Sequence, residues 1–365
     1  MPVNYAARGS GQPSSAASVA DQRDHPYAFG RPVNYGAALP VSKTAESHVT
    51  DTTPRKEFSP VVWDERLAED CRQLVQLAIR EDLDRLYDWT TIALVPDDAR
   101  GRADVVARQP GVVAGLPAAA LALDVCSSGA ECASQVEDGA VVSPGQHVAV
   151  LAGPVRGLLT AERVILNLLA RLCGIATLTR QYVDAIADTH ARVYDTRKTT
   201  PGWRRLEKYA VRIGGGHNHR TGLFDAVLIK DNHLAWFAGG KAIDGTVAAQ
   251  AVVAARKFLD SMVPGGADAM IVEIEVDSID MLPDVLAAAP DVVLLDNMSP
   301  QQLAAAVAQR DRDAPQVELE ASGGIDLQTI AAVAATGVDR ISVGALTHAA
   351  ASLDLGLDWH SGGDA

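Results

Sequence analysis

The most constraining feature of the sequence is a regular alternation that begins near residue 190. Short, near-continuous apolar stretches alternate there with longer stretches of helical periodicity, which indicates a parallel sheet built from βαβ units. The expected strands are 192–196, 225–230, 270–276, 291–295, 316–321 and 340–344. The expected helices are 203–213, 241–259, 278–289, 300–308 and 327–336.

The number of strands decides between two architectures. Six or seven strands fall short of the eight of a complete barrel, so the pattern favours a truncated, incomplete six- to seven-stranded α/β barrel over residues 190–350. A doubly wound open sheet stays open as an alternative, although no GxGxxG motif follows an early strand.

The segment before residue 190 has a mixed pattern. Apolar residues at helical spacing predict a helix over 64–81, strand-like stretches cover 103–107 and 147–151, and an alanine-rich helix is expected at 116–125. Thr160 has the character of an N-cap that opens a long helix. We therefore predict an amino-terminal α/β sandwich at 61–189 that ends in a long connecting helix, and a segment at 351–365 that returns toward it.

Residues 1–60 differ in composition from the rest of the chain. They are rich in Ser, Ala, Pro and Gly and contain one Leu and no Ile. Such a segment cannot bury enough apolar surface to offset its ordering entropy, so we expect a disordered or loosely packed extension.

Charge and hydropathy exclude several classes of protein. The net charge of −14 disfavours nucleic-acid binding, and no apolar run is long enough to span a membrane. The first residues lack a signal-peptide pattern, and the four cysteines have neither zinc-like nor disulfide-scaffold spacing. We expect a cytoplasmic protein without a membrane or nucleic-acid partner.

Polar residues recur where the expected strands end. The carboxyl ends of parallel strands build the active site in α/β folds, so these residues are candidate site residues. They are Asp195, Thr196, Arg197, Lys198, Lys230 to His233, Glu273, Glu275, Asp296, Asn297, Ser322 to Gly324, and Gly344.

The stretch 197–220 is strongly basic in an acidic protein. It contains seven Lys and Arg residues and a single acid, Glu207, which suggests a pocket for a polyanion. A solvated helix face is the alternative for four of the cations. These four are Arg204, Arg205, Lys208 and Arg212.

Two further groups have their own alternatives. The Ser322-Gly323-Gly324 turn, which we expect to begin a helix at about Asp326, suits a phosphate together with Gly344, although an ordinary tight turn has the same residues. Glu275 and Asp296 suit Mg²⁺, directly or through water, or sugar hydroxyls. The alternative for these carboxylates is an internal salt bridge to Lys198 or Lys230, and Lys230 could also form a Schiff base.

Longer motifs in the chain resemble the quinolinate phosphoribosyltransferase family, in order over about 62–355. In the amino-terminal half they are Asp88-Trp89-Thr90-Thr91, Gly111 to Leu116, Glu162-Arg163 and Leu166 to Leu169. In the barrel they are Thr196 to Gly202, Asn218-His219-Arg220, Ile229 to His233, Glu275 to Ser278, Leu294 to Asn297, Glu320 to Gly324 and Ile341 to Ala345.

The resemblance implies an activity. The family transfers a phosphoribosyl group from phosphoribosyl pyrophosphate to quinolinate with decarboxylation, giving nicotinate mononucleotide, pyrophosphate and CO₂ in de novo NAD biosynthesis, with Mg²⁺. It implies catalytic roles for Lys198, Lys230, Glu275 and Asp296. It implies substrate binding by Arg163, Thr196, Arg197, Lys198, His219, Arg220, Lys230, Glu275, Asp296, Ser322, Gly323, Gly324, Val343, Gly344 and Ala345, with Glu275 and Asp296 also as the Mg²⁺ ligands.

The resemblance further implies a homodimer, or a higher oligomer of it, in which Arg163 reaches the neighbouring subunit's site. A related barrel phosphoribosyltransferase acting on another aromatic or heterocyclic acid is the main alternative. A Schiff-base aldolase and a non-catalytic binding protein are weaker ones.

Overall fold

The computed structural model describes residues 55–262 and 269–360. Most of the predicted loose extension therefore lies outside the described residues. Its last six residues, 55–60, are an exception, and the prediction is wrong for them. They pack against the barrel because Phe58 is buried and because Arg55 pairs with Asp339 at 2.9 Å.

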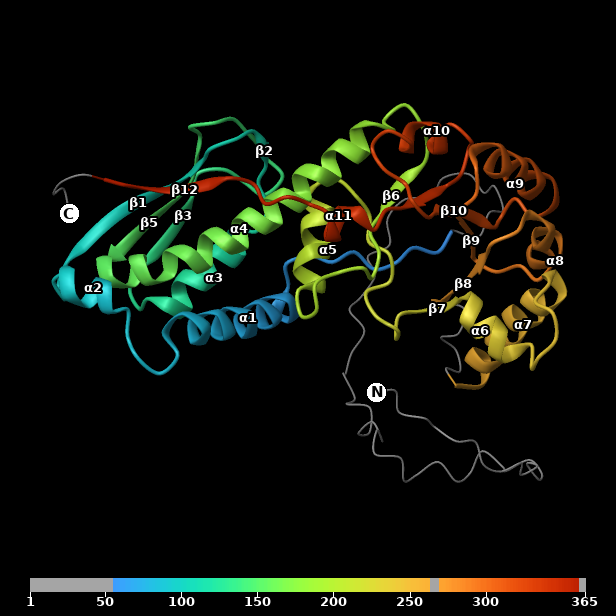
Figure 1. Ribbon diagram of the computed structural model, residues 1–365, viewed down its shortest axis with the longest axis horizontal. Helices are drawn as coiled ribbons and strands as arrows, with labels where there is room; N and C mark the ends of the chain where they lie inside the picture. Colours follow the sequence, from blue (N-terminus) through green and yellow to red (C-terminus); the bar gives the residue numbers. More distant parts are fainter. Residues whose placement is uncertain (1–54, 263–268, 361–365) are drawn as a thin grey trace, which may run out of the picture. The chain divides into compact units, whose positions relative to one another are not determined.

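The amino-terminal half is an antiparallel sheet covered by helices (Figure 1). Its strand order is β12-β1-β5-β3, and α3 and the long helix α4 pack on each other and on this sheet. The strands are β1 (Arg100–Ala107), β3 (Glu131–Ser134), β5 (His147–Pro154) and β12 (Leu355–Trp359), with β2 (Gly111–Val112) and β4 (Val141–Val142) forming a separate pair. The helices are α1 (Glu65–Leu83), α2 (Trp89–Leu94), α3 (Leu116–Cys126) and α4 (Val155–Asp184).

Helix α4 corrects one prediction. It begins at Val155, directly after β5, with Pro154 in the N-cap position. Proline has a fixed φ that suits a helix start and lacks the N–H that would have no partner there. Thr160 therefore lies inside the helix, and its hydroxyl contacts Asp88 at 3.3 Å instead of capping α4.

The second half is an incomplete barrel of six parallel strands, as predicted. The strand order is β6-β11-β10-β9-β8-β7, so the first and last strands of the unit are neighbours. A doubly wound sheet places its first strand in the interior with helical connections running both ways, so this order excludes that alternative. The strands are β6 (Arg192–Tyr194), β7 (Ala226–Ile229), β8 (Ile271–Val276), β9 (Val292–Asp296), β10 (Glu318–Ser322) and β11 (Arg340–Ser342).

The barrel helices follow the predicted order, but the helix predicted over 278–289 begins with a 3-10 helix at Ile279, and the short helix Ala345–His348 was not predicted. The segment predicted as one helix over 241–259 begins at Gly245, and a seven-residue helix, α6, precedes it directly after Lys230. A helix this short carries no readable periodicity. The helices are α5 (Arg204–Ile213), α6 (Asp231–Phe237), α7 (Gly245–Met262), η2 (Ile279–Met281), α8 (Leu282–Ala287), α9 (Pro300–Asp313), α10 (Ile330–Ala334) and α11 (Ala345–His348).

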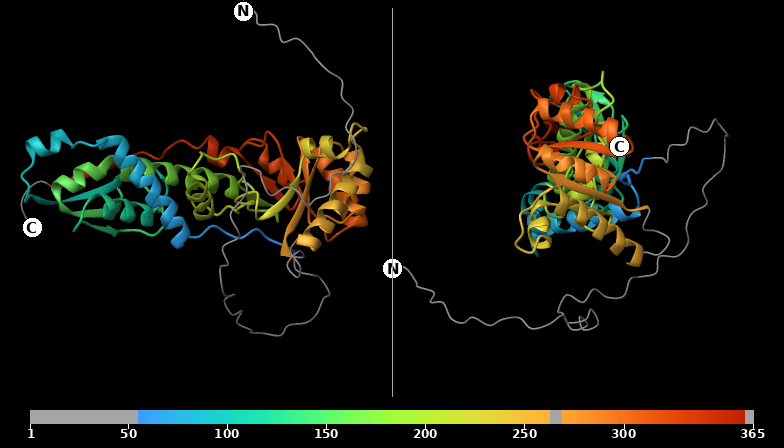
Figure 2. Two further views of the ribbon diagram at one scale, coloured as in Figure 1. Left: turned by 90° about the horizontal axis from the view of Figure 1, so that it is seen from below. Right: turned by 90° about the vertical axis from the view of Figure 1, so that its right-hand side faces the viewer.

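Two long-range connections join the halves of the described chain. Strand β12 follows the barrel and pairs antiparallel with β1. The segment 55–64 extends from α1 to the barrel strands (Figure 2, blue). Among the helices that the structure describes, none is long and apolar enough to cross a membrane.

Candidate active site

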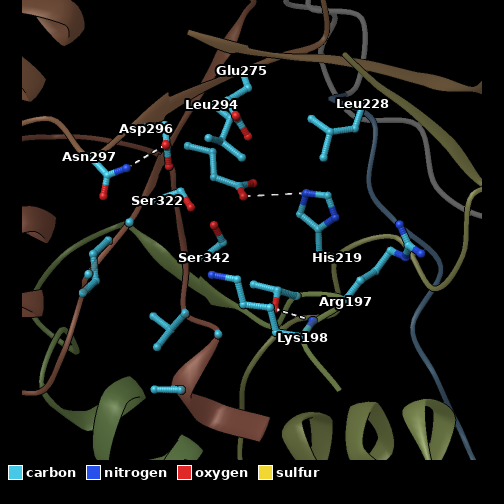
Figure 3. Close-up of a pocket in the computed structure, with 18 of the residues that line it drawn as sticks. Arg197, Lys198, His219, Leu228, Glu275, Leu294, Asp296, Asn297, Ser322 and Ser342 are labelled. Carbon is cyan, nitrogen blue, oxygen red and sulfur yellow. Dashed lines mark hydrogen bonds and ion pairs between the residues drawn. The ribbon is translucent and has the colours of Figure 1, made fainter. Parts of the chain in front are cut away.

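A cavity of about 730 Å³ lies at the carboxyl ends of the barrel strands (Figure 3). It brings together every site residue that the family resemblance implies except Arg163. Five of the strand-end candidates do not line it, namely Asp195, Asp231, Asn232, His233 and Glu273. The predicted residues that line it are Thr196, Arg197, Lys198, His219, Arg220, Lys230, Glu275, Asp296, Ser322, Gly323, Gly324, Val343, Gly344 and Ala345.

Strand geometry explains why these residues meet. Side chains two apart on a strand share a face, so the residues before and after a strand end line one cavity. This periodicity also explains four lining residues that our sequence analysis missed. Leu228, Leu294, Glu320 and Ser342 each stand two positions before a predicted site residue. Asn297, Ile325 and His348 also line the cavity.

The basic side of the cavity consists of cations that repel one another. The Nε atoms of Arg197 and Arg220 are buried, and neither has a hydrogen-bond partner within the described residues. Burial and the nearby charge of Arg197 lower the pKa values of Arg204 and Arg220. Buried donors without acceptors are costly, so this arrangement is typical of a site that awaits an anion.

One cation of the basic stretch belongs to the protein's interior instead. Lys208 is fully buried, so the solvated helix face that was the alternative for this residue is wrong. Its ammonium pairs with Asp195 and donates to the carbonyl of His219 at 2.8 Å. Asp195 also accepts from the N–H of His219 at 2.8 Å, so this ion pair fixes the loop that carries the site residues. Of the other three, Arg212 is exposed as predicted.

His219 lies at the base of the cavity against two buried glutamates. Its Nε2 is 2.9 Å from Glu273 and 3.6 Å from Glu320, and its Nδ1 accepts the N–H of Arg220 at 2.8 Å. These three side chains place potential metal ligands within 4.8 Å of one another. A neutral imidazole that accepts at Nδ1 must carry its proton on Nε2, so His219 cannot ligate a metal there.

The cluster nevertheless holds a further proton near neutral pH. Burial would lower the pKa of His219, but the two carboxylates outweigh it and raise that pKa. Burial, and then the charge of Glu273, raises the pKa of Glu320 to about 7. Because the N–H of Arg220 occupies the position that a second imidazole proton would take, we assign the extra proton to Glu320.

The acidic side of the cavity faces Arg197 and Lys198 (Figure 3). Glu275 forms an ion pair with Lys230, and Asp296 accepts from the side-chain amide of Asn297 at 2.7 Å. The salt-bridge alternative is thus correct for Glu275. A paired ammonium is a poor nucleophile, so this contact argues against a Schiff base at Lys230.

The glycine turn has a backbone that other residues would not adopt. Gly323 and Gly324 have φ of 98° and 60°, and a Cβ on Gly323 would lie 2.2 Å from Asn297 Oδ1. At Gly344 a Cβ would lie 2.9 Å from the Lys198 side chain. The helix that we expected at about Asp326 begins only at Ile330, because Asp326 accepts the N–H groups of Gln328 and Thr329 in a turn. The phosphate-binding prediction therefore depends on the turn itself.

Arg163 is the residue implied by the family resemblance that does not line the cavity. It lies on α4 with an exposed side chain, outside the lining of the cavity. This position does not bring it to the site of its own chain.

The fold and the cavity together define an α/β-barrel enzyme for multiply anionic substrates. The family models for quinolinate phosphoribosyl transferase match this chain, the N-terminal domain over 88–173 and the C-terminal domain over 175–358. The chain belongs to the quinolinate phosphoribosyltransferase family.

Individual relatives agree with this assignment. The chain is 46% identical over 289 residues to a nicotinate-nucleotide pyrophosphorylase (carboxylating) of Mycobacterium leprae, covering 79% of this chain and 96% of that protein. It is 34% identical over 351 residues to a Nicotiana glauca quinolinate phosphoribosyltransferase (decarboxylating), covering 91% and 92%. The solved nicotinate-nucleotide pyrophosphorylase of Francisella tularensis superposes with a TM-score of 0.71 at 36% identity, covering 84% and 100%.

Proposed function

We propose that this protein transfers the phosphoribosyl group of phosphoribosyl pyrophosphate to quinolinate and decarboxylates the product. The reaction yields nicotinate mononucleotide, pyrophosphate and CO₂ in de novo NAD biosynthesis. The observation that carries the proposal is the cavity itself, where two arginines whose Nε donors have no partner in the described residues face a glycine turn and two carboxylates. The names of the curated relatives support quinolinate over another acid as the acceptor.

The cationic side of the cavity binds quinolinate in this proposal. Quinolinate is a dianion, and the forks of Arg197 and Arg220 suit its two carboxylates. His219 contacts the same molecule, and Thr196 and Lys198 lie at the edge shared with the second substrate. The turn Ser322-Gly323-Gly324 and the segment Val343-Gly344-Ala345 bind the 5′-phosphate through backbone amides.

Charge stabilisation and positioning supply the catalysis. Departure of pyrophosphate leaves cationic character on the ribose, and the carboxylates of Glu275 and Asp296 stabilise it. Lys198 and Lys230 neutralise the leaving pyrophosphate. The ring nitrogen of quinolinate then attacks the sugar and becomes a pyridinium. That ring accepts the electron pair of the adjacent carbon–carboxylate bond as CO₂ leaves, and a proton takes its place.

Mg²⁺ is the proposed cofactor. Glu275 and Asp296 offer hard oxygen ligands at the ends of neighbouring strands, and hard oxygen ligands beside a pyrophosphate are what Mg²⁺ prefers. When bound, Mg²⁺ would neutralise pyrophosphate oxygens. The pairing of Glu275 with Lys230 holds this carboxylate at the cavity until the substrate arrives.

We further propose a homodimer with shared sites, in which Arg163 completes the neighbouring cavity. Its exposure on α4, away from the cavity of its own chain, supports this role. Mixing inactive Arg163→Ala with inactive Lys230→Ala should restore about a quarter of the wild-type activity, since one hybrid site in each mixed dimer is intact. No recovery of activity between subunits that are shown to exchange would refute shared active sites.

We also propose a cytoplasmic location, since all four cysteines are unpaired.

Release of CO₂ from carboxyl-labelled quinolinate tests the main proposal. Release should require both phosphoribosyl pyrophosphate and Mg²⁺ and should match the nicotinate mononucleotide formed. Folded protein that binds the donor but releases no CO₂ would contradict quinolinate as the acceptor.

A further inference from the structure

The segment Arg55–Phe58 crosses the amino-terminal ends of the barrel strands, opposite the mouth of the cavity. It lies outside both matched family regions, which begin at residue 88. We call it the floor arm. Arg55 contacts the beginnings of β10 and β11, Lys56 those of β8 and β9, and Glu57 contacts β6. The contacts are Arg55 with Asp339 and Glu318, Lys56 with Asp291 and the carbonyl of Met270, and Glu57 with Arg192 and Tyr194.

The charges of the floor arm complement the barrel residue by residue. Two cations of the arm meet carboxylates, and its one anion meets arginines. Lys56 Nζ lies 2.9 Å from Asp291, and the Lys56 carbonyl accepts from Arg340 at 2.9 Å. Seven separate polar partners for three residues specify one register of the arm on the barrel.

Phe58 ends the arm inside the barrel. It forms a buried cluster with Ala226, Ile271, Val292 and Tyr194. Ala226 and Val292 stand two positions before Leu228 and Leu294, which line the cavity. Because residues two apart share a strand face, the ring of Phe58 lies one layer below the cavity.

The cavity residue that Phe58 contacts is His219. The two rings stack with their centroids 4.4 Å apart and their planes inclined by 30°. Nδ1 of His219 accepts the N–H of Arg220, and Nε2 lies 2.9 Å from Glu273. Phe58 covers the face of the imidazole and so prevents it from tilting toward the amino-terminal end.

The two glutamates beside His219 are shielded from water as well. Both oxygens of Glu273 and of Glu320 are buried without an aligned hydrogen-bond donor in the described part of the chain. An opening at the arm would hydrate these carboxylates and give His219 other acceptors. The low polarity around the cluster, and with it the single orientation of His219, depends on the ring of Phe58.

We propose that the floor arm closes the active site from below and that Phe58 is a positioning residue for quinolinate binding through His219. This proposal rests on the proposed function for its substrate. It gives a role in the reaction to a part of the chain that precedes the family domains and touches no substrate.

Phe58→Leu in the full-length protein tests the role. Losing the stacked ring should raise the KM and the calorimetric Kd for quinolinate roughly fivefold, and leave the KM for phosphoribosyl pyrophosphate within about twofold. Val61→Ala is the matched control. Val61 lies three residues after the floor arm and is buried in the main core, so its truncation should lower stability without altering either KM. Equal changes in both KM values, or an unchanged quinolinate KM, would overturn the proposal.

A second measurement is independent of turnover. ¹⁵N shifts of His219 should report the Nε2–H tautomer in the wild type and a mixture of tautomers in Phe58→Leu. An unchanged tautomer in the variant would also overturn the proposal. If Phe58→Leu does not fold, Phe58→Met retains the volume without the aromatic face and serves in its place. If the wild-type protein does not turn over quinolinate, the proposed function is refuted but the role of the floor arm is not, because the His219 tautomer tests that role independently of turnover.

Discussion

The two ends of the barrel use arginine in opposite ways. At the amino-terminal end, Arg340 is completely buried, donates twice to Glu318 and lies over the rings of Tyr194 and Phe58. At the carboxyl end, Arg197 and Arg220 have buried donors without partners. Both ends are built from the same strands.

This difference separates structural charge from binding charge. The difference is the ion pair with a carboxylate, since Arg340 also leaves one buried nitrogen, Nη1, without a hydrogen-bond partner in the described residues. Removing a buried cation that is ion-paired leaves its partner carboxylate uncompensated and destabilises the fold. A cation without partners weakens the empty protein and acquires its acceptors from a ligand. Substitutions at the two ends should therefore affect different quantities, stability at one end and affinity at the other.

The largest effect is expected at the amino-terminal end. Arg340→Ala leaves Glu318 with fewer donors in the interior and should lower the free energy of unfolding by about 3–5 kcal/mol. Urea denaturation measures this loss. Arg312→Ala is the control, because the Arg312 side chain is 69% exposed and should change stability by less than about 0.5 kcal/mol. A loss below about 1 kcal/mol for Arg340→Ala would remove the distinction between the two ends.

Arg197→Ala should have the reverse effect. Losing a charge-assisted contact to a carboxylate costs about 3 kcal/mol, so the kcat/KM for quinolinate should fall roughly 150-fold. The stability of the empty protein should stay unchanged or rise slightly, because repulsion from Arg204 and Arg220 disappears. Steady-state kinetics and denaturation together measure both quantities. The exposed Arg212→Ala serves as control, and a large stability loss in Arg197→Ala would contradict the comparison.

The glycine turn gives a smaller effect at the carboxyl end. A Cβ on Gly323 would meet Asn297 Oδ1 at 2.2 Å, whereas one on Gly324 would meet nothing within 4 Å. Gly323→Ala should therefore distort the turn and raise the KM for phosphoribosyl pyrophosphate roughly 10- to 30-fold, which corresponds to about 2 kcal/mol. Gly324→Ala shares only the cost of positive φ, so its effect should be clearly smaller. Equal effects would show that close approach at Gly323 is not what the turn requires.

The same two ends differ in how far the sequence predicts them. The carboxyl-end residues could be predicted because a parallel strand that ends in Asp296 or Lys230 places that residue at the active-site edge. The layer below, with Leu294 and Glu320, follows from the period of two along the same strands, a signal that we did not use. The parallel strands and the incomplete barrel of six to seven strands were predicted for the same local reasons, whereas the order of the strands in the sheet was not predicted.

Features fixed by distant partners could not be predicted from local patterns. Lys208 is typical of an exposed helix face until Asp195, thirteen residues away, is placed beside it. The floor arm, Arg-Lys-Glu-Phe, is too short to show a periodicity, and only the barrel's charges and the cluster around Phe58 order it. Arg163 was identified by resemblance alone, since nothing near it in the chain signals a site.

The smallest predicted effect concerns the layer between the two ends. Glu320 has a pKa of about 7 in the folded protein against 4.5 for an ordinary glutamate, so the folded state binds this proton more tightly than the unfolded state. Its contribution to stability is complete below pH 4.5 and is lost as the pH rises through 7. For a pKa near 7, linkage gives a loss of about 1 kcal/mol between pH 6 and pH 8.

Glu320→Gln isolates this contribution, because an amide keeps the shape of the side chain without the titration. The variant should lack the loss of stability between pH 6 and pH 8 and should exceed the wild type in stability at pH 8. Urea denaturation at the two pH values measures this, and His348→Gln, at the cavity but outside the cluster, is the control. If Glu320→Gln keeps the pH dependence of stability of the wild type, the extra proton belongs to His219. The Nδ1 atom of His219 then cannot accept the N–H of Arg220. The layer between the two ends would then contain a positively charged His219. The boundary between structural and binding cations would lie one layer nearer the amino-terminal end of the barrel.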